Sequence, residues 1–185
     1  MAGSRVFTKM DLRSGFHQIQ VVPEHRERTA FQTRYGSFQF RVMPFGICNA
    51  PATFQSTMNL LLQEYHEFCT VYIDDIVVHS RTEVDHERHL RLVLSKLRAE
   101  KFFAKRSKCL FALPRIDFCG FVVSAQGIEK QPEKIESITN WPVPKCAKDI
   151  RAFLGICGFH QRFIKSHAHA AAPLTELIKS TNPWT

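Results

Sequence analysis

The sequence predicts an α+β fold, with antiparallel strands and amphipathic helices in a first domain, residues 1–128, and a small helical domain in residues 129–185. Within residues 17–43 apolar residues alternate around a turn signal, and at residues 69–79 two apolar runs flank a pair of aspartates; both patterns predict β-hairpins. Two other stretches carry apolar residues at helical spacing. After Gly127 the composition changes and prolines separate short helical segments, so we place the domain boundary there.

The first predicted strand ends in an acid. Residues 6–10 alternate as a strand does and Asp11 follows directly, so its carboxylate is expected at a strand tip. Residues 17–43 are rich in Gln, Arg and Thr and have a turn signal at residues 35–37. They predict a hairpin that exposes basic side chains.

Two long helices are expected in the first domain. Asn49 as N-cap and Pro51 in the first turn begin a helix that runs to about Glu64. A second helix is expected at residues 83–101. Its His86 and His89 could begin a zinc site, but further ligands are missing nearby, so we expect surface histidines. The residues available for buried faces are Ala52, Phe54, Met58, Leu61 and Leu62 in the first helix and Leu90, Val93, Leu94 and Leu97 in the second.

The last part of the chain predicts one strand at residues 118–123, a turn at 124–127, and helices at about 133–140, 147–165 and 172–180. Gly155 and Gly158 lie inside the second of these helices, where each costs about 1 kcal/mol relative to Ala. Close approach to a nucleic-acid backbone would explain them, and so would tight helix packing. The expected buried stripe of this helix is Ile150, Phe153, Leu154, Cys157 and Ile164.

The composition narrows the class of protein. A net charge of +8 favours a polyanionic partner. No stretch approaches the roughly 20 apolar residues that span a bilayer, and no signal peptide is evident. We therefore expect a soluble intracellular protein with no membrane partner, in a cytoplasmic particle or the nucleus. The six cysteines form no C-x-x-C pair and predict reduced core residues.

Two adjacent acids stand out in the apolar pattern. Asp74 and Asp75 lie between residues 71–73 and 76–78, which are all apolar or aromatic. A carboxylate pair in an apolar sheet is costly unless it is paired or binds a cation. A polar hairpin turn is the simpler explanation. With Asp11 at another strand end, however, three carboxylates could converge to hold two Mg²⁺ ions.

Five segments, in chain order, resemble the motifs of one polymerase family. Residues 7–19 look like polymerase motif A, 43–55 like motif B, 72–76 like motif C, 118–123 like the primer grip and 151–155 like part of the thumb. The ordered set is similar to the reverse transcriptases of gypsy-type long-terminal-repeat retrotransposons, over nearly the whole chain. The resemblance implies a palm, in which an antiparallel sheet has helices on one face, with a partial fingers insertion at about residues 17–43 and a helical thumb.

The resemblance also implies an activity and a set of site residues. The activity is RNA- and DNA-directed DNA synthesis, in which Asp11, Asp74 and Asp75 are catalytic and bind two Mg²⁺ ions, or Mn²⁺ in their place, with the Leu12 carbonyl. Lys105 and Lys108 are candidates for a basic group near the leaving pyrophosphate, but a basic surface loop would explain them equally well. Expected dNTP contacts are Phe16, Phe45 and Gly46, although Phe16 could instead be a core residue and the other two a packing motif at a helix start. Expected nucleic-acid contacts are Gln55, Tyr72, Ile73, Gly120, Phe121, Arg151, Gly155, Phe159 and Arg162.

The implied partners are an RNA or DNA template with a DNA primer, dNTPs, and RNase H and integrase regions of a parent polyprotein. The chain begins almost at motif A, without the N-terminal fingers, so we expect the isolated segment to polymerise weakly. Two positions depart from the family: Phe16 stands where Tyr is usual, and Cys119-Gly120-Phe121 replaces Leu-Gly-His or Leu-Gly-Tyr. The alternative function is a non-catalytic remnant that binds nucleic acid or a protein.

Overall fold

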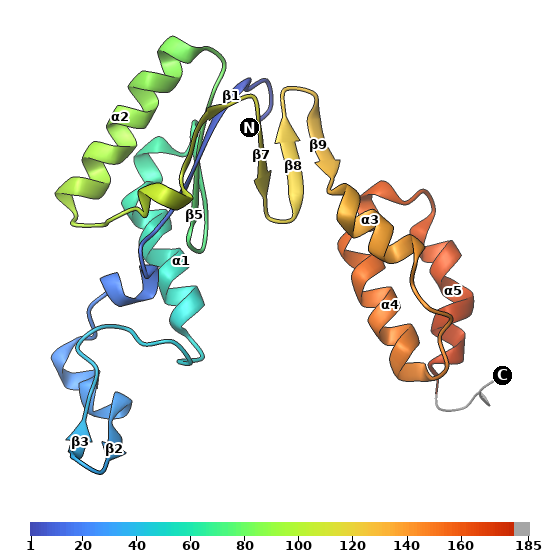
Figure 1. The fold of residues 1–185 in the computed structure, drawn as a ribbon, viewed down its shortest axis with the longest axis horizontal. Coiled ribbons are helices and arrows are strands. Elements are labelled where there is room, and N and C mark those ends of the chain that lie inside the picture. Colours follow the sequence, from blue (N-terminus) through green and yellow to red (C-terminus); the bar gives the residue numbers. More distant parts are fainter. Residues whose placement is uncertain (180–185) are drawn as a thin grey trace. The chain divides into compact units, whose positions relative to one another are not determined.

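The computed structural model describes residues 1–179, which divide into two compact units, Met1–Ile128 and Glu129 onward (Figure 1). None of the helices within residues 1–179 is long and apolar enough to cross a membrane.

The first unit is built on an antiparallel sheet of four strands. Its order is β4-β5-β1-β6, formed by β4 (Cys69–Tyr72), β5 (Asp75–Ser80), β1 (Val6–Asp11) and β6 (Leu110–Leu113). The predicted first strand and the predicted hairpin at residues 69–79 are confirmed. In the β1–β5 register Asp11 lies opposite Asp75, so the acidic ends of the two strands meet at one edge of the sheet.

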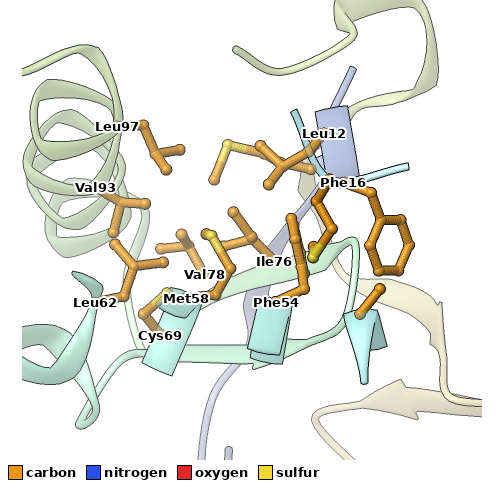
Figure 2. Packing of buried hydrophobic residues seen from close by; sticks show 13 residues of the cluster. Leu12, Phe16, Phe54, Met58, Leu62, Cys69, Ile76, Val78, Val93 and Leu97 are labelled. Carbon is orange, nitrogen blue, oxygen red and sulfur yellow. The ribbon is translucent and has the colours of Figure 1, made fainter. Parts of the chain in front are cut away.

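Helices α1 (Ala50–Leu61) and α2 (Glu83–Ala99) pack on one face of this sheet. Figure 2 shows side chains of both helices and of β5 pointing toward one another, among them Phe54, Ile76 and Val93. Both predicted helices are confirmed, and Thr82 caps α2 by accepting a hydrogen bond from the Asp85 N–H at 3.1 Å. The expected burial of Ala52 and Leu94 was wrong because they point away from the sheet.

The opposite face of β1 and β5 is covered by the hairpin of β7 (Arg115–Phe118) and β8 (Phe121–Ser124), where Ile116 and Val123 pack against Phe7 and Val77. β7 and β8 belong to a second sheet, of three strands in the order β7-β8-β9, whose last strand β9 (Gly127–Lys130) lies at the boundary of the two units. The prediction of one strand at 118–123 was wrong. Cys119 and Gly120 have φ values of 49° and 79° and form a tight turn, which reverses the chain.

The segment between β1 and α1 contains the 3₁₀ turns η1 (Gly15–Gln18) and η2 (Pro23–Thr29) and the hairpin of β2 (Phe31–Thr33) and β3 (Gly36–Phe38). The predicted hairpin is confirmed. Because Thr33 pairs with Gly36, its turn is formed by residues 34–35, one residue earlier than predicted.

Further 3₁₀ turns are η3 (Gln63–Tyr65), η4 (Arg106–Lys108) and η5 (Gln161–Phe163).

The expectation of surface histidines was wrong. His86 is buried between α2 and the sheet, where its Nε2 lies 2.7 Å from Thr8 Oγ1 and its Nδ1 lies 3.0 Å from Ser80 Oγ. These hydroxyls satisfy both ring nitrogens, so the imidazole can be buried without a metal. His89 is partly buried and stacks on Phe68 with ring centroids 3.8 Å apart.

The cysteines are free, as predicted, but only Cys69 and Cys157 are buried; Cys48 and Cys146 are exposed and the other two are intermediate. The core expectation was therefore wrong for most of them.

The second unit contains α3 (Pro132–Thr139), α4 (Ala147–Phe159) and α5 (His167–Leu177). The predictions of α3 and α4 are confirmed. However, α4 ends at Phe159 and not at residue 165, because the chain there tightens into the 3₁₀ turn η5. The third helix begins earlier than expected, and Pro173 lies inside it. Residue 180 of that predicted helix is outside the described residues. On α4, Ile150 and Cys157 are buried, while Phe153 and Leu154 are only partly so.

Candidate active site

A cavity of about 630 Å³ lies where β1, the β4–β5 turn and the η4 segment meet, and we call it the carboxylate cavity. It contains two acids and four basic residues. Its lining residues are Asp11, Leu12, Arg13, Ser14, Gly15, Phe45, Asp74, Ala104, Lys105, Arg106 and Lys108.

Backbone hydrogen bonds hold the three walls of this cavity together. The Leu12 N–H donates to the Asp74 carbonyl at 3.4 Å, which joins the end of β1 to the β4–β5 turn. The Lys105 N–H donates to the Asp11 carbonyl at 2.8 Å, and Leu12 forms a bridge with Ala104. The basic η4 segment is therefore fixed beside Asp11, although about a hundred residues separate them in the sequence.

Asp74 has the most unusual environment of the three acids. Its Oδ1 is buried, and among residues 1–179 it has no hydrogen-bond partner. Burial, followed by the negative charges of Asp11 and Asp75, raises the pKa of the Asp74 carboxyl above its ordinary value, and Lys108 offsets part of this effect. The carboxylate is thus the least stabilised acid of the cavity and the one with most to gain from a cation.

The absence of a side chain at Gly15 makes space for the carboxylate of Asp74. A Cβ at this position would lie 2.5 Å from Asp74 Oδ1 and 2.9 Å from Phe54 Cζ, both shorter than real Cβ contacts. We did not predict a role for Gly15. The sequence feature that could have indicated this role is the position of Gly15, four residues after Asp11 and inside the motif A segment.

The other two acids form ion pairs with lysines. Lys108 Nζ lies 3.4 Å from Asp11 Oδ2, and Lys9 Nζ lies 2.8 Å from Asp75 Oδ2. Asp75 is not part of the cavity lining. Within residues 1–179 no three His, Cys, Asp or Glu side chains gather as metal ligands would, so the described structure does not show the expected convergence of three carboxylates. The physical reason is that three carboxylates repel one another unless a cation lies between them, and here Asp11 and Asp75 each pair with a lysine instead.

The turn that carries Asp74 is braced by Gln55. The side-chain Oε1 of Gln55 accepts a 2.6 Å hydrogen bond from the Ile73 N–H, and its Nε2 donates to the Val71 carbonyl at 3.1 Å. Ile73 has φ 50°, a strained value for a β-branched residue, so it needs such support. We expected Gln55 to face a template strand, but its amide is turned to the hairpin instead. Tyr72, next to this turn, is exposed.

The residues expected to contact a dNTP differ in their surroundings. Phe45 lines the cavity and is 66% exposed, whereas Phe16 is buried in the core, with ring centroids 5.1 Å from Phe45 and 5.2 Å from Phe54. Phe16 therefore does not line the cavity; its ring makes an edge-to-face contact with Phe45, which does. Gly46 has φ 93° and is not part of the cavity lining.

The β7–β8 turn carries Gly120 and Phe121, the expected primer contacts, on the sheet face opposite to α1 and α2. In the second unit, Arg151, Gly155 and Arg162 are exposed, and Lys134 Nζ lies 5.2 Å from the ring centroid of Phe159.

The helical glycines of α4 are not needed for packing. A Cβ at Gly155 or at Gly158 would meet no described atom within 4 Å. Within residues 1–179, tight helix packing therefore does not explain them. Close approach of a ligand to α4 stays a prediction.

The comparisons with known proteins agree on one family. The family model described as reverse transcriptase (RNA-dependent DNA polymerase) matches residues 1–156. The Pol polyprotein of transposon 297 from Drosophila melanogaster is 40% identical over 94% of this chain and 16% of its own length. The transposon Tf2-3 polyprotein of Schizosaccharomyces pombe is 37% identical over 98% of this chain and 14% of its own length. The chain thus spans less than a fifth of the curated relatives it matches.

Solved structures show the same fold. The foamy viral protease–reverse transcriptase in complex with double-stranded DNA has a TM-score of 0.88 and 25% identity, over 97% of this chain and 31% of that chain. The same protein in complex with an RNA/DNA hybrid has a TM-score of 0.82, over 99% of this chain and 25% of that chain. These matches confirm the predicted α+β fold. From its sequence and its fold, the chain belongs to the reverse transcriptase (RNA-dependent DNA polymerase) family.

Proposed function

We propose that this chain is the palm and thumb of an RNA-directed DNA polymerase that also copies DNA, with residues 1–128 as palm and partial fingers and the second unit as thumb. The observation that carries the proposal is the carboxylate cavity. It places Asp11 and Asp74 opposite the basic residues Lys105, Arg106 and Lys108. Acids that hold cations and bases that neutralise phosphates are the two requirements of nucleotidyl transfer.

The donors in the cavity suit Mg²⁺, which prefers carboxylate oxygens. The buried Oδ1 of Asp74, without a hydrogen-bond partner in residues 1–179, is the kind of atom that a cation would satisfy. Asp11 and Asp74 would hold two Mg²⁺ ions, or Mn²⁺, with Asp75 and the Leu12 carbonyl as further ligands. When bound, the metal would make the primer 3′-hydroxyl a better nucleophile and stabilise the departing pyrophosphate.

The chain's own side chains would position the dNTP. Arg13, Lys105 and Arg106 would neutralise the triphosphate, and Lys108, already near Asp11, would lie at the pyrophosphate end. The exposed ring of Phe45 would contact the sugar or base. Phe16 behind it would keep that ring in place, so the pair would exclude a 2′-hydroxyl and select deoxynucleotides.

The proposed nucleic-acid partner is a primer–template duplex. The net charge of +8 favours a polyanion, and α4 presents Arg151 beside the exposed Gly155. Gly120 and Phe121 at the β7–β8 turn would contact the primer. Since the curated relatives are polyproteins, RNase H and integrase regions of a longer product are proposed neighbours.

Primer extension on an RNA template with Mg²⁺ tests the proposal. The chain would be assayed alone and joined to the N-terminal fingers segment of the transposon 297 relative, each with an Asp74→Asn control. We expect extension by the joined protein, weak extension by the chain alone, and none by either control. Duplex affinity should fall as salt rises.

The second candidate function is a non-catalytic remnant that binds nucleic acid or a protein. The pairing of Asp11 and Asp75 with lysines favours it, since both charges are already compensated. Salt-dependent duplex binding by the joined protein without any extension would support this alternative and overturn the polymerase.

A further inference from the structure

Lys9 lies on the same face of β1 as Asp11, two residues before it. Side chains two apart on a strand point to the same face, and this is the face that the β7–β8 hairpin covers, as the contact of Phe7 with Ile116 shows. In the β1–β5 register Lys9 lies opposite Val77, so Asp75 is its diagonal neighbour on the same face. The register therefore brings the ammonium group of Lys9 within reach of one of the three acids.

The Lys9 ammonium bridges two separate parts of the first unit. Its Nζ lies 2.8 Å from Asp75 Oδ2, and it also donates a hydrogen bond to the main-chain carbonyl of Asp117, on β7, at 3.2 Å. The two side chains are only 22% and 28% exposed, so water screens this pair less than it screens an ion pair on the open surface. The ammonium thus joins an acid of the β4–β5 turn to the backbone of the β7–β8 hairpin.

The three acids differ in whether they line the carboxylate cavity. Asp11 and Asp74 line the carboxylate cavity, while Asp75 is not part of its lining and is bound to Lys9. The apolar contacts of Ile116 and Val123 hold the hairpin against the sheet, but such contacts are not directional and do not by themselves specify its position along the sheet. The bonds from Lys9 are directional, and they fix the position of β7 relative to the acids.

We propose that Lys9 is a positioning residue that locks the β7–β8 hairpin to Asp75, so that the Cys119–Gly120 turn and the acids of the cavity keep a fixed spacing. This inference rests on the proposed function, in which the hairpin holds the primer end and the cavity holds the dNTP. A fixed spacing then sets the distance between the primer hydroxyl and the nucleotide, on which the rate of transfer depends steeply.

The first test measures the lock itself and needs no polymerase activity. Amide hydrogen exchange of the chain, followed by mass spectrometry, would compare Lys9→Met, which keeps the length of the side chain, with Lys9→Arg, which keeps the charge. We expect Lys9→Met to speed exchange at residues 115–124 at least about fivefold, with α1 unchanged and Lys9→Arg close to wild type. Unchanged exchange at 115–124 in Lys9→Met would overturn the proposal.

The second test measures primer extension by the protein joined to a fingers segment. Lys9→Met should lower kcat about tenfold or more while KM for the dNTP stays within about twofold, and Lys9→Arg should recover most of the loss. Combining Lys9→Met with Asp75→Asn should cost less than the product of the two single effects, because both remove the same contact. The proposal would be overturned if the double variant lost as much as the product of the two single losses, or if Lys9→Met kept the wild-type kcat.

The two tests separate this inference from the proposed function. If the wild-type joined protein does not extend primers, the polymerase proposal fails. The exchange result still decides whether Lys9 locks the hairpin to Asp75.

Discussion

Two hairpins of the first unit were both predicted from the sequence and have opposite surroundings. The carboxylate hairpin, β4–β5, lies in the main sheet with Ile76, Val77 and Val78 fully buried. The aromatic hairpin, β2–β3, is exposed at every residue of both strands, and Figure 1 shows it at the end of the unit remote from the main sheet. The buried hairpin has continuous apolar runs at residues 71–73 and 76–78, whereas apolar and polar residues are mixed in the strands of the exposed one.

The difference shows in how each turn is held. The carboxylate hairpin keeps a left-handed Ile73 and a buried acid, and it needs Gln55, Lys9 and a glycine at position 15 to do so. The aromatic hairpin is held by its own side chains, with Arg34 over the ring of Tyr35 at 4.6 Å and Phe31 stacked on Phe38. Strained conformations that other segments support are common at active sites, which agrees with the role proposed for this turn.

The largest effect is expected from Asp74→Asn. Primer extension by the joined protein should fall by about three orders of magnitude or more, since one ligand and one charge are lost. The folded protein should become more stable at neutral pH. Because the pKa of Asp74 is raised in the folded state, the charged carboxylate opposes folding, and this cost is present above the folded pKa and disappears as the pH falls below the unfolded value. Urea unfolding at pH 7 and pH 3 tests this: the unfolding free energy of Asp74→Asn should exceed that of the wild type at pH 7 but not at pH 3. Lower stability of Asp74→Asn at pH 7 would contradict it.

The next effect compares two aromatic truncations. Phe54→Ala removes a fully buried ring beside Gly15 and should cost about 3–5 kcal/mol of unfolding free energy. Phe31→Ala, its matched control in the aromatic hairpin, removes a ring that is 44% exposed and should cost about 1 kcal/mol or less. Denaturant titration of both variants gives the difference. Equal losses would mean that the aromatic hairpin is packed as tightly as the core.

The sequence was sufficient to place Asp11 and Asp74 near one another, because each follows a recognisable strand and the ends of these strands meet in an antiparallel sheet. It could not show the lysine partners. The pair between Lys108 and Asp11 spans 97 positions, and the bond from Lys9 to the Asp117 carbonyl spans 108. Such contacts depend on register and on loop path, which no local pattern encodes.

Two other features were beyond local pattern for different reasons. The Cys119–Gly120 turn lacks the Asn-Gly or Asp-Gly signal of a two-residue hairpin, so the apolar residues around it looked like one strand. His86 looked like a surface residue because α2 is charged, and its burial depends on hydroxyls of Thr8 and Ser80 that come from other elements. The polar partner of a buried group can be far away in the sequence.

Acid should weaken the carboxylate hairpin before the aromatic one. Burial, followed by nearby positive charges, lowers the pKa of His79 on β5 to about 4, and burial also lowers that of His86. The unfolded chain binds these protons more readily, so stability is complete above the ordinary histidine pKa and falls as the pH drops from about 6.5 toward 4. Hydrogen exchange, corrected for intrinsic rates, should therefore speed up at residues 69–80 across this range. His79→Gln should flatten the dependence, and an unchanged slope would rule out His79 as its source.

The smallest effect compares the hydrogen bonds that brace each turn. Gln55→Leu leaves the Ile73 N–H without its acceptor in a partly buried site, so it should cost about 1–3 kcal/mol of unfolding free energy. Thr33→Val removes the matching contact of the aromatic hairpin, where the Thr33 hydroxyl accepts from the Tyr35 N–H at 3.1 Å. That turn is exposed and water replaces the lost partner, so the change should stay within about 0.5 kcal/mol. If Thr33→Val costs as much as Gln55→Leu, then the strain at Ile73 is not what makes the carboxylate turn depend on outside support.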